Sequence, residues 1–348
     1  MSKRKNQHFV PQFYLRNFSN NGDGKTINLF NPTKELFVCG VPIKNQSSKN
    51  FFYGKDGRVE EGLSQIENIL APKIAEITKT NNLPRKFSDE HIAILIFMIL
   101  NDLRNPTHIE QIKAYSKLAN REFGLENPQD VLPETTHEAA VELAFSNYDQ
   151  VLRTCMDLDF KLLINNTSSS LLTCDFPSIK YNQFLEKKTM YGSITGYATV
   201  GLQILLPINS EKCLLFFDPA IYKVGNKKDL SIQLTNEDVD QINTLQILNC
   251  WQNTYFNEKV EESYVRKIHE KSKRFKKANE LNATSHGVIR EKQVRDNEQI
   301  IHFRSTDLLI KLKLSKIKLT RRANNTDLEN RICPMREKAR LIVEKNYR

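Results

Sequence analysis

The sequence predicts an α+β fold, in which a helical N-terminal half packs on a small, mainly antiparallel sheet and a basic C-terminal extension follows. Apolar residues at helical spacing dominate before residue 158, and short apolar runs bounded by turn residues dominate after it. Lysine and arginine concentrate near the C-terminus. A chain of 348 residues can form one large domain with an appendage. We therefore expect a body over residues 1–265 and a basic extension over residues 266–348.

The first half begins with strand signals and then becomes helical. Strands are expected over Thr26–Phe30 and Glu35–Val38, on either side of the turn signal at Pro32. Ser88 is a typical N-cap for an apolar helix that the step before Pro106 would end. The helices of this half are expected over residues 59–77, 88–104, 107–123 and 134–157, the first of them bent at Pro72.

The second half is expected to combine strands with a helix. Thr235 is expected to cap an amphipathic helix whose pattern continues past Tyr255 toward Phe275. After Gly287, apolar and basic residues alternate, which is typical of one or two edge strands or of a basic arm that orders on a partner. Strands are expected over residues 160–164, 171–174, 201–206, 212–217 and 230–234.

The composition indicates a cytoplasmic protein without a membrane segment. The longest apolar run, Ile92–Leu100, is shorter than the roughly 20 residues that cross a bilayer. The basic N-terminus is not followed by the apolar stretch of a signal peptide. The six cysteines show no spacing typical of zinc sites or disulfide frameworks, so we expect reduced, buried thiols.

The net charge of +10 is unevenly distributed along the chain. Residues 259–348 contain 24 lysines and arginines against 12 aspartates and glutamates, and the remainder is close to neutral. Such a surface would attract nucleic acid through the release of counterions, although a solvated helix face gives the same pattern. The residues expected to contact nucleic acid are Lys271, Lys273, Arg274, Lys276, Lys277, Lys316, Lys318, Arg321 and Arg322.

The segment His8–Phe18 is the most distinctive string of the chain. Histidine can act as a base near neutral pH, and arginine presents a planar fork that suits phosphate. The alternative is that these side chains satisfy backbone groups and fix the N-terminus to the core. If the segment is extended, its polar side chains share one side of the chain: His8, Gln12, Tyr14 and Arg16.

Two further polar residues lie at the ends of predicted elements. Asp175 follows a predicted strand just before Pro177, a place where carboxylates either function or cap a turn. Arg104 ends an apolar helix and is expected to pair with Glu67 or Asp175, which suits a structural role as well as a functional one. The sequence contains no P-loop, dinucleotide-binding, zinc-protease or serine-hydrolase motif.

The opening string resembles the start of an uncharacterised bacterial family, a conserved domain of unknown function that begins His-x-Val-Pro-Gln-x-Tyr-Leu-Arg. The likeness continues more loosely in Asn50–Tyr53, in Arg104–Pro106 and in Thr173–Pro177, over roughly residues 7–260. The resemblance points to mobile or defence-related gene sets, and so to nucleic-acid substrates. It also favours a single site formed by His8, Gln12, Tyr14, Arg16, Arg104 and Asp175.

Three hypotheses for the function follow. The first is a nuclease of antiviral defence, a hydrolase in which His8 is the general base or acid and Arg16 or Arg104 stabilises charge on the phosphorane. Asp175 would orient His8 or, with Glu67, bind a magnesium ion. The second is a non-catalytic protein that binds nucleic acid or an acidic partner through the extension. The third is an enzyme that acts on a small phosphorylated metabolite or nucleotide.

Overall fold

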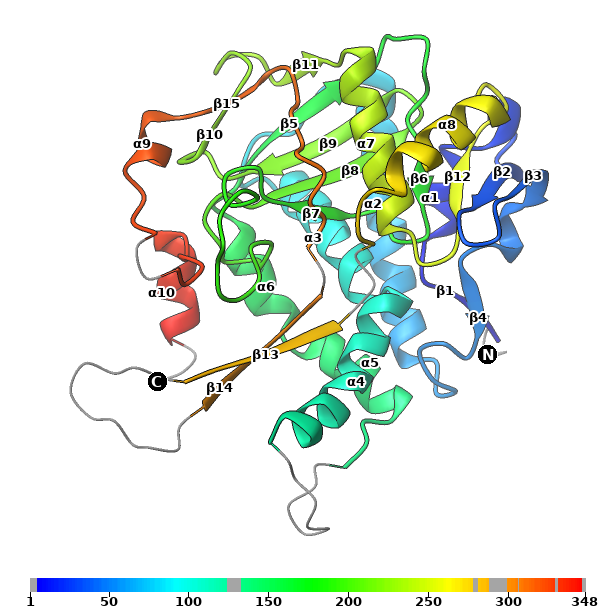
Figure 1. The fold of residues 1–348 in the computed structure, drawn as a ribbon. Helices are drawn as coiled ribbons and strands as arrows, with labels where there is room; N and C mark the ends of the chain where they lie inside the picture. Colours follow the sequence, from blue (N-terminus) through cyan, green and yellow to red (C-terminus); the bar gives the residue numbers. More distant parts are fainter. Residues whose placement is uncertain are drawn as a thin grey trace.

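The computed structural model shows a mixed α+β protein whose helices and strands alternate along the chain (Figure 1). Four short strands precede the first long helix, and two helices, α7 (Asn236–Asn249) and α8 (Glu262–Ser272), lie among the later strands. The α+β class is confirmed, but the expected division into a helical half and a sheet half is wrong. The structure describes residues 5–123, 133–277, 281–287, 299–305, 307–328 and 331–345.

Local signals begin the main helices where the sequence predicts them. Ser88 accepts a hydrogen bond from the backbone N–H of His91, and Thr235 forms a reciprocal capping box with Asp238. Pro72 lies inside a helix that continues through it. The other helices are α1 (Gln12–Arg16), α2 (Arg58–Thr80), α3 (Asp89–Leu103), α4 (Pro106–Phe123), α5 (His137–Ser146), α6 (Tyr148–Cys155), α9 (Arg321–Asn324) and α10 (Glu337–Lys345), with 3₁₀ turns η1 (Asn20–Gly22) and η2 (Ile43–Asn45).

The strands form two main sheets and three two-stranded ladders. Their bounds are β1 (Asn6–His8), β2 (Thr26–Asn31), β3 (Leu36–Pro42), β4 (Ser48–Asn50), β5 (Asp159–Ile164), β6 (Thr173–Cys174), β7 (Ile179–Tyr181), β8 (Gln203–Asn209), β9 (Lys212–Phe217), β10 (Tyr222–Val224), β11 (Ser231–Gln233), β12 (Thr254–Phe256), β13 (Leu281–Gly287), β14 (Gln299–Ser305) and β15 (Ile317–Leu319). The five-stranded sheet has the order β11-β5-β9-β8-β7, the four-stranded sheet has the order β3-β2-β12-β6, and the ladders are β1-β4, β10-β15 and β13-β14. Among the pairs of named strands, β5 and β11 are parallel and the others are antiparallel, as expected.

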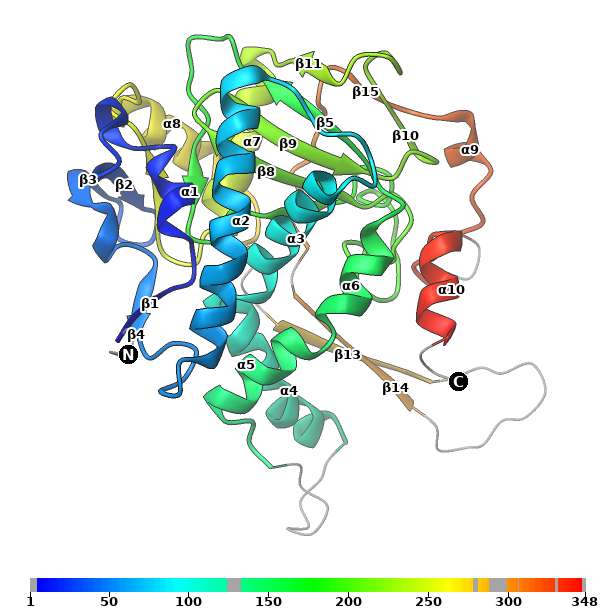
Figure 2. The ribbon, with the colours of Figure 1, turned by 180° about the vertical axis from the view of Figure 1, so that it is seen from behind.

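The five-stranded sheet is covered on both faces. Alternate residues of β9 show this: Leu214 and Phe216 belong to the core shared with α2 and α3, whereas Leu215 and Phe217 belong to the core shared with α7. Figures 1 and 2 show α7 on one side of this sheet and α2 and α3 on the other. A strand buried on both faces needs a continuous apolar run, which explains the sequence of β9.

The C-terminal part of the chain packs against this body. Helix α8 runs across residue 265, where we expected the extension to begin. Lys311 and Lys313 are exposed, while the apolar residues that alternate with them are buried beside α7. After Gly287, strands form over β14, which pairs with β13, and over β15, which pairs with β10. The buried members of the alternation are Leu308, Ile310, Leu312 and Leu314.

Three predicted elements differ from the structure. The helix that begins after Thr235 does not continue past Tyr255, because α7 ends at Asn249 and Tyr255 lies in β12. The helix expected over residues 134–157 is two helices, which meet at Asn147. The opening segment is extended only in β1 and turns into helix α1 after the proline at position 11.

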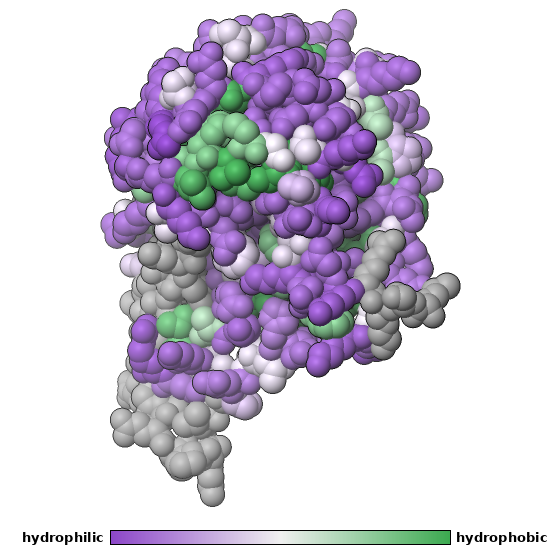
Figure 3. Space-filling model, turned by 90° about the vertical axis from the view of Figure 1, so that its right-hand side faces the viewer, coloured by the Kyte–Doolittle hydropathy of each residue, from purple (hydrophilic) through white to green (hydrophobic). Residues whose placement is uncertain are grey.

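The surface agrees with the composition. Within the described residues, no helix combines the length and the hydropathy that crossing a bilayer would require. The right-hand side of Figure 1, which carries β2 and β3, is mainly hydrophilic, with a prominent hydrophobic patch in its upper half and smaller hydrophobic areas elsewhere (Figure 3).

Candidate active site

Four of the six predicted site residues line one pocket of about 350 Å³. Strand β1, helix α1 and the end of α3 supply these side chains, and one face of α2 forms a further wall. Arg16 is exposed at this pocket, so solvent reaches it. The four residues that the structure brings together are His8, Gln12, Arg16 and Arg104.

Arg104 is buried at the end of α3 and holds the pocket together. Its side chain is only 3% exposed, and its Nη1 donates to Oε1 of Glu67 at 2.7 Å. Its Nε donates to the hydroxyl of Tyr53 at 3.1 Å, and its Nη2 donates to the backbone carbonyl of His8. Although burial lowers it, the neighbouring Tyr53 and Glu67 raise the pKa of Arg104 above its usual value. The guanidinium therefore stays charged and fixes β1 against α2 and α3.

His8 lies at the rim of the pocket and is partly exposed. Its Nε2 lies 3.1 Å from the backbone carbonyl of Lys44, so Nε2 is the protonated nitrogen when the ring is neutral. In that tautomer the basic lone pair is on Nδ1. A carbonyl that fixes the tautomer in this way is a common means of orienting a functional histidine.

Helix α1 explains how Gln12 and Arg16 reach the same pocket. The two residues are one turn apart, with Nη2 of Arg16 3.5 Å from Oε1 of Gln12. The opposite face of this short helix carries Tyr14 and Leu15, which are buried. An amphipathic turn of helix thus replaces the expected extended alternation.

Tyr14 points into the core instead of the pocket. Its hydroxyl lies 2.6 Å from Oγ1 of Thr173 and donates to the carbonyl of Pro207 at 2.6 Å. Burial raises the pKa of Tyr14 well above its usual value. The predicted catalytic role is therefore not supported for Tyr14, which joins α1 to β6 and β8 within the core.

Asp175 is also a core residue, with only 1% of its surface exposed. Its Oδ1 accepts the backbone N–H of Trp251 at 2.7 Å, and its Oδ2 accepts those of Gln252 and Asn253 at 2.8 Å each. Burial outweighs these hydrogen bonds and raises the pKa of Asp175 to about 6. The carboxylate ties the segment after α7 to the end of β6. Because both its oxygens are used in this way, the predicted magnesium site with Glu67 is not supported.

The wall formed by α2 contains residues that the sequence analysis did not select. Glu67, which it did consider, lines the pocket together with Glu60, Ser64 and Asn68. Their spacing of three, four and seven residues places all of them on one face of a helix. The helical period of α2 was therefore a usable signal for Ser64 and Asn68.

The predicted nucleic-acid contacts fall into two groups on different parts of the surface. One follows α8, where Lys271 pairs with Asp240 at 2.7 Å and Lys273 pairs with Glu35 at 2.8 Å. The other follows β15 and α9, which lie on the opposite side of the molecule from α8 in Figures 1 and 2. Of the nine residues, Lys277 is half-buried; the exposed ones are Lys271, Lys273, Arg274, Lys276, Lys316, Lys318, Arg321 and Arg322.

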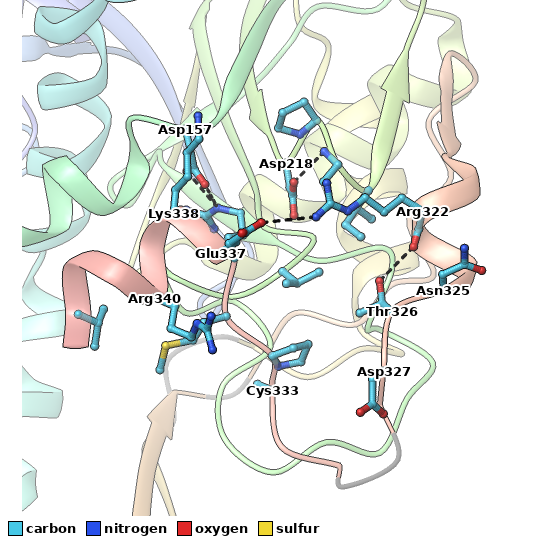
Figure 4. Close-up of a pocket in the computed structure, with 18 of the residues that line it drawn as sticks. Asp157, Asp218, Arg322, Asn325, Thr326, Asp327, Cys333, Glu337, Lys338 and Arg340 are labelled. Carbon is cyan, nitrogen blue, oxygen red and sulfur yellow. Dashed lines mark hydrogen bonds and ion pairs between the residues drawn. The ribbon is translucent and has the colours of Figure 1, made fainter. Parts of the chain in front are cut away.

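A second, larger pocket of about 1010 Å³ lies between the body and the C-terminal segment (Figure 4). Two of its carboxylates already have partners. Both oxygens of Asp157 accept from Nε of Arg336, at 3.1 and 3.0 Å, and Asp218 accepts the backbone N–H groups of Gly201 and Ala220, each at 2.9 Å. This pocket has charge and volume, but these two acids hold the fold together.

The fold and the pocket define a mixed α+β protein with a sheet covered on both faces and a polar pocket at its N-terminal strand. The chain belongs to the family described as "Protein of unknown function (DUF4238)", whose model matches residues 6–260. The predicted family resemblance is thereby confirmed. The match includes every residue that lines the pocket near His8. No curated protein and no solved structure matches the chain.

Proposed function

We propose that this chain is a hydrolase that cleaves a phosphodiester bond of nucleic acid in the pocket between β1, α1 and α2. The observation that supports this proposal most is the convergence of a tautomer-fixed histidine, an exposed arginine and two carboxylates on one pocket, namely His8, Arg16, Glu60 and Glu67. These are groups that general acid–base catalysis and charge stabilisation at phosphorus require.

The proposal assigns a distinct role to each of four residues, His8, Arg16, Glu60 and Arg104. Nδ1 of His8 takes the proton of the attacking water or hydroxyl as the new bond to phosphorus forms. Arg16 stabilises the negative charge of the phosphorane. Glu60, when protonated, gives its proton to the leaving oxygen as the old bond breaks. Arg104 positions His8 through the backbone carbonyl and does not touch the substrate.

The surroundings of the pocket support a nucleic-acid substrate. The exposed lysines and arginines after residue 270 provide cationic surfaces on two sides of the body, and each would attract a phosphate backbone. Cys155, Cys174, Cys213 and Cys250 are buried free thiols, which fits a reducing cytoplasm and hence intracellular nucleic acid. The family resemblance, which points to defence-related gene sets, agrees with a role as a defence effector.

The test compares the wild type with His8→Asn on labelled single- and double-stranded DNA and on RNA, with and without magnesium. His8→Asn is expected to lower the cleavage rate by about a hundredfold or more. His137→Asn is the matched control, because Nε2 of His137 also lies beside a backbone carbonyl, that of Phe52 at 2.7 Å, but outside the pocket. Absence of cleavage by the wild type, or equal rates in both variants, would contradict the proposal.

The second candidate is a non-catalytic protein that binds nucleic acid. It is favoured by the structural roles of Tyr14, Arg104 and Asp175, which leave few of the predicted site residues for chemistry. Deleting residues 266–348 would also remove Leu308–Leu314 from the core, so charge substitution is the cleaner test. Changing Lys316, Lys318, Arg321 and Arg322 to glutamine should weaken binding and flatten its salt dependence if that group binds.

The matched variant changes Lys271, Lys273, Arg274 and Lys276 to glutamine. If only one variant weakens binding, the binding face is identified. If the wild type binds but does not cleave, and His8→Asn binds equally well, the second candidate replaces the first.

A further inference from the structure

Three potential metal ligands meet at a place that is separate from the pocket near His8. Glu35 lies in the turn between β2 and β3, and His269 and Glu270 lie near the end of α8. Each side chain offers one ligand atom, and these three atoms lie within 4.8 Å of one another. An imidazole with two carboxylates is a donor set that zinc and related divalent metals accept.

His269 gives an independent indication of a ligand. Its ring is buried, at 6% exposure, and neither ring nitrogen has a hydrogen-bond partner among the described residues. Its Nε2 lies 3.5 Å from Oε1 of Glu35, a contact that is an ion pair only when the ring is protonated and that leaves the neutral ring without a good hydrogen bond. Buried polar atoms nearly always have a partner, and coordination of a metal by Nε2 would provide one.

The ammonium group of Lys273 occupies the position in this cluster at which the two carboxylates stabilise positive charge. This group lies 2.8 Å from Oε1 of Glu35 and 2.5 Å from Oε1 of Glu270. Both carboxylates are at least half exposed, so a hydrated ion can reach them. A divalent ion attracts two carboxylates more strongly than one ammonium does, and the lysine side chain can swing into solvent. The ligand atoms would then approach to about 3.4 Å from one another, as bonds of about 2.1 Å to tetrahedral zinc require.

We propose that Glu35, His269 and Glu270 form a binding site for a divalent transition-metal ion such as zinc, with water as the fourth ligand. The bound ion would join the β2–β3 turn to α8 and displace Lys273. The site is independent of the proposed phosphodiester cleavage, since none of its three residues lines the pocket near His8.

The test is titration of the full chain with cobalt(II), followed by visible absorption, and then displacement of cobalt by zinc. One cobalt per chain is expected, with ligand-field bands and without the near-ultraviolet band of thiolate ligands. His269→Gln and Glu35→Gln should each weaken binding by about tenfold or more. Lys273→Met should tighten binding, because it removes the competing ammonium.

The matched controls lie on the same helix. Glu262→Gln removes a carboxylate that pairs with Arg266, and Lys271→Met removes a lysine that pairs with Asp240. Neither control should change cobalt affinity. Equal affinity of the wild type, His269→Gln and Lys273→Met would overturn the proposal, and so would a thiolate spectrum. Because Lys273 is exposed, Lys273→Met should leave the fold intact. This variant therefore tests the site even if a substitution at the buried His269 disturbs folding.

Discussion

The pocket near His8 and the larger pocket at the C-terminal segment differ in what surrounds them, although a buried arginine supports each. At the pocket near His8, Arg104 donates to Glu67, to Tyr53 and to one backbone carbonyl. At the larger pocket, Arg336 donates to Asp157 and to three backbone carbonyls, those of residues 154, 197 and 199. The first pocket lies entirely within the family match, and the second is formed largely by residues after it.

We therefore base the proposed site on its exposed polar side chains and not on its volume. At the larger pocket, Asp157 attaches the C-terminal segment to the body by accepting from Arg336, and Asp218 accepts backbone N–H groups of the body itself. The smaller pocket keeps an exposed arginine, a partly exposed histidine and carboxylates on its walls. Arg336 is thus predicted to act as a clamp, that is, to hold the C-terminal segment on the body. Arg104 is predicted to position His8.

The largest effect on stability is expected at the clamp. Arg336→Met leaves Asp157, whose side chain is only 15% exposed, and three backbone carbonyls without their donor, so the free energy of unfolding should fall by about 3–5 kcal/mol. Arg322→Met is the control, because Arg322 is exposed and 3.8 Å from Glu337, and such a pair is worth about 0–1 kcal/mol. Urea unfolding measures both. Equal loss in the two variants would show that Arg336 does not clamp the segment.

A somewhat smaller loss is expected at the positioning residue. Arg104→Met removes the partner of Glu67 and should lower the free energy of unfolding by about 2–4 kcal/mol. The loss is smaller than at Arg336 because a quarter of the Glu67 side chain is exposed, so water can solvate the carboxylate that remains. Arg104→Met should also lower cleavage by folded molecules, since the backbone carbonyl of His8 loses the hydrogen bond from Arg104. Arg153→Met, which breaks an exposed pair with Asp149, is the control. Full activity in folded Arg104→Met would contradict the positioning role.

Asp175 is expected to affect stability alone. Asp175→Asn replaces an acceptor oxygen by an NH₂ group that faces backbone N–H donors, which should cost about 2–3 kcal/mol. Cleavage per folded molecule should be unchanged, and exposed Asp149→Asn should change neither property. If Asp175→Asn kept wild-type stability but lost activity, the carboxylate of Asp175 would have a role in the site and not only in the fold.

The smallest effect concerns His91, which is buried on α3, the helix that ends at Arg104. Burial, and then the charge of Lys86, lower the pKa of His91 to about 4 from 6.5. The folded state favours the neutral ring. The contribution of His91 to the free energy of unfolding is therefore fully present above pH 6.5 and is lost as the pH falls toward 4. The wild type should lose on the order of 2 kcal/mol more than His91→Gln between pH 7 and pH 4.5. Parallel stability curves would contradict this.

The sequence predicts the local parts of this fold well and its long-range parts less well. Ser88 and Thr235 cap the expected helices, and the alternation in Leu308–Leu314 matches its burial. Strand β12 was missed because its partners β2 and β6 lie far away in the sequence. Helix α7 ends where Asp175, from a distant strand, accepts the next backbone N–H groups. Periodicity does not carry such information.

The candidate site shows the same division. The pairing of Arg104 with Glu67 was one of two predicted alternatives and is confirmed. Tyr14 was assigned to the wrong side because the segment after Pro11 turns into a helix of five residues, which is too short for a periodic signal. The sequence could not show that Asp175 would be enclosed by a distant loop. Residue type alone does not distinguish a carboxylate in a pocket from one in a core.

The most direct test of the central claim is to follow the imidazole ¹⁵N chemical shifts of His8 and His137 while a short oligonucleotide is added. The account predicts that the His8 signal moves in a saturable way and that the His137 signal stays in place. An unchanged His8 signal at saturation of binding, or equal movement of both signals, would contradict a phosphate-binding pocket at strand β1.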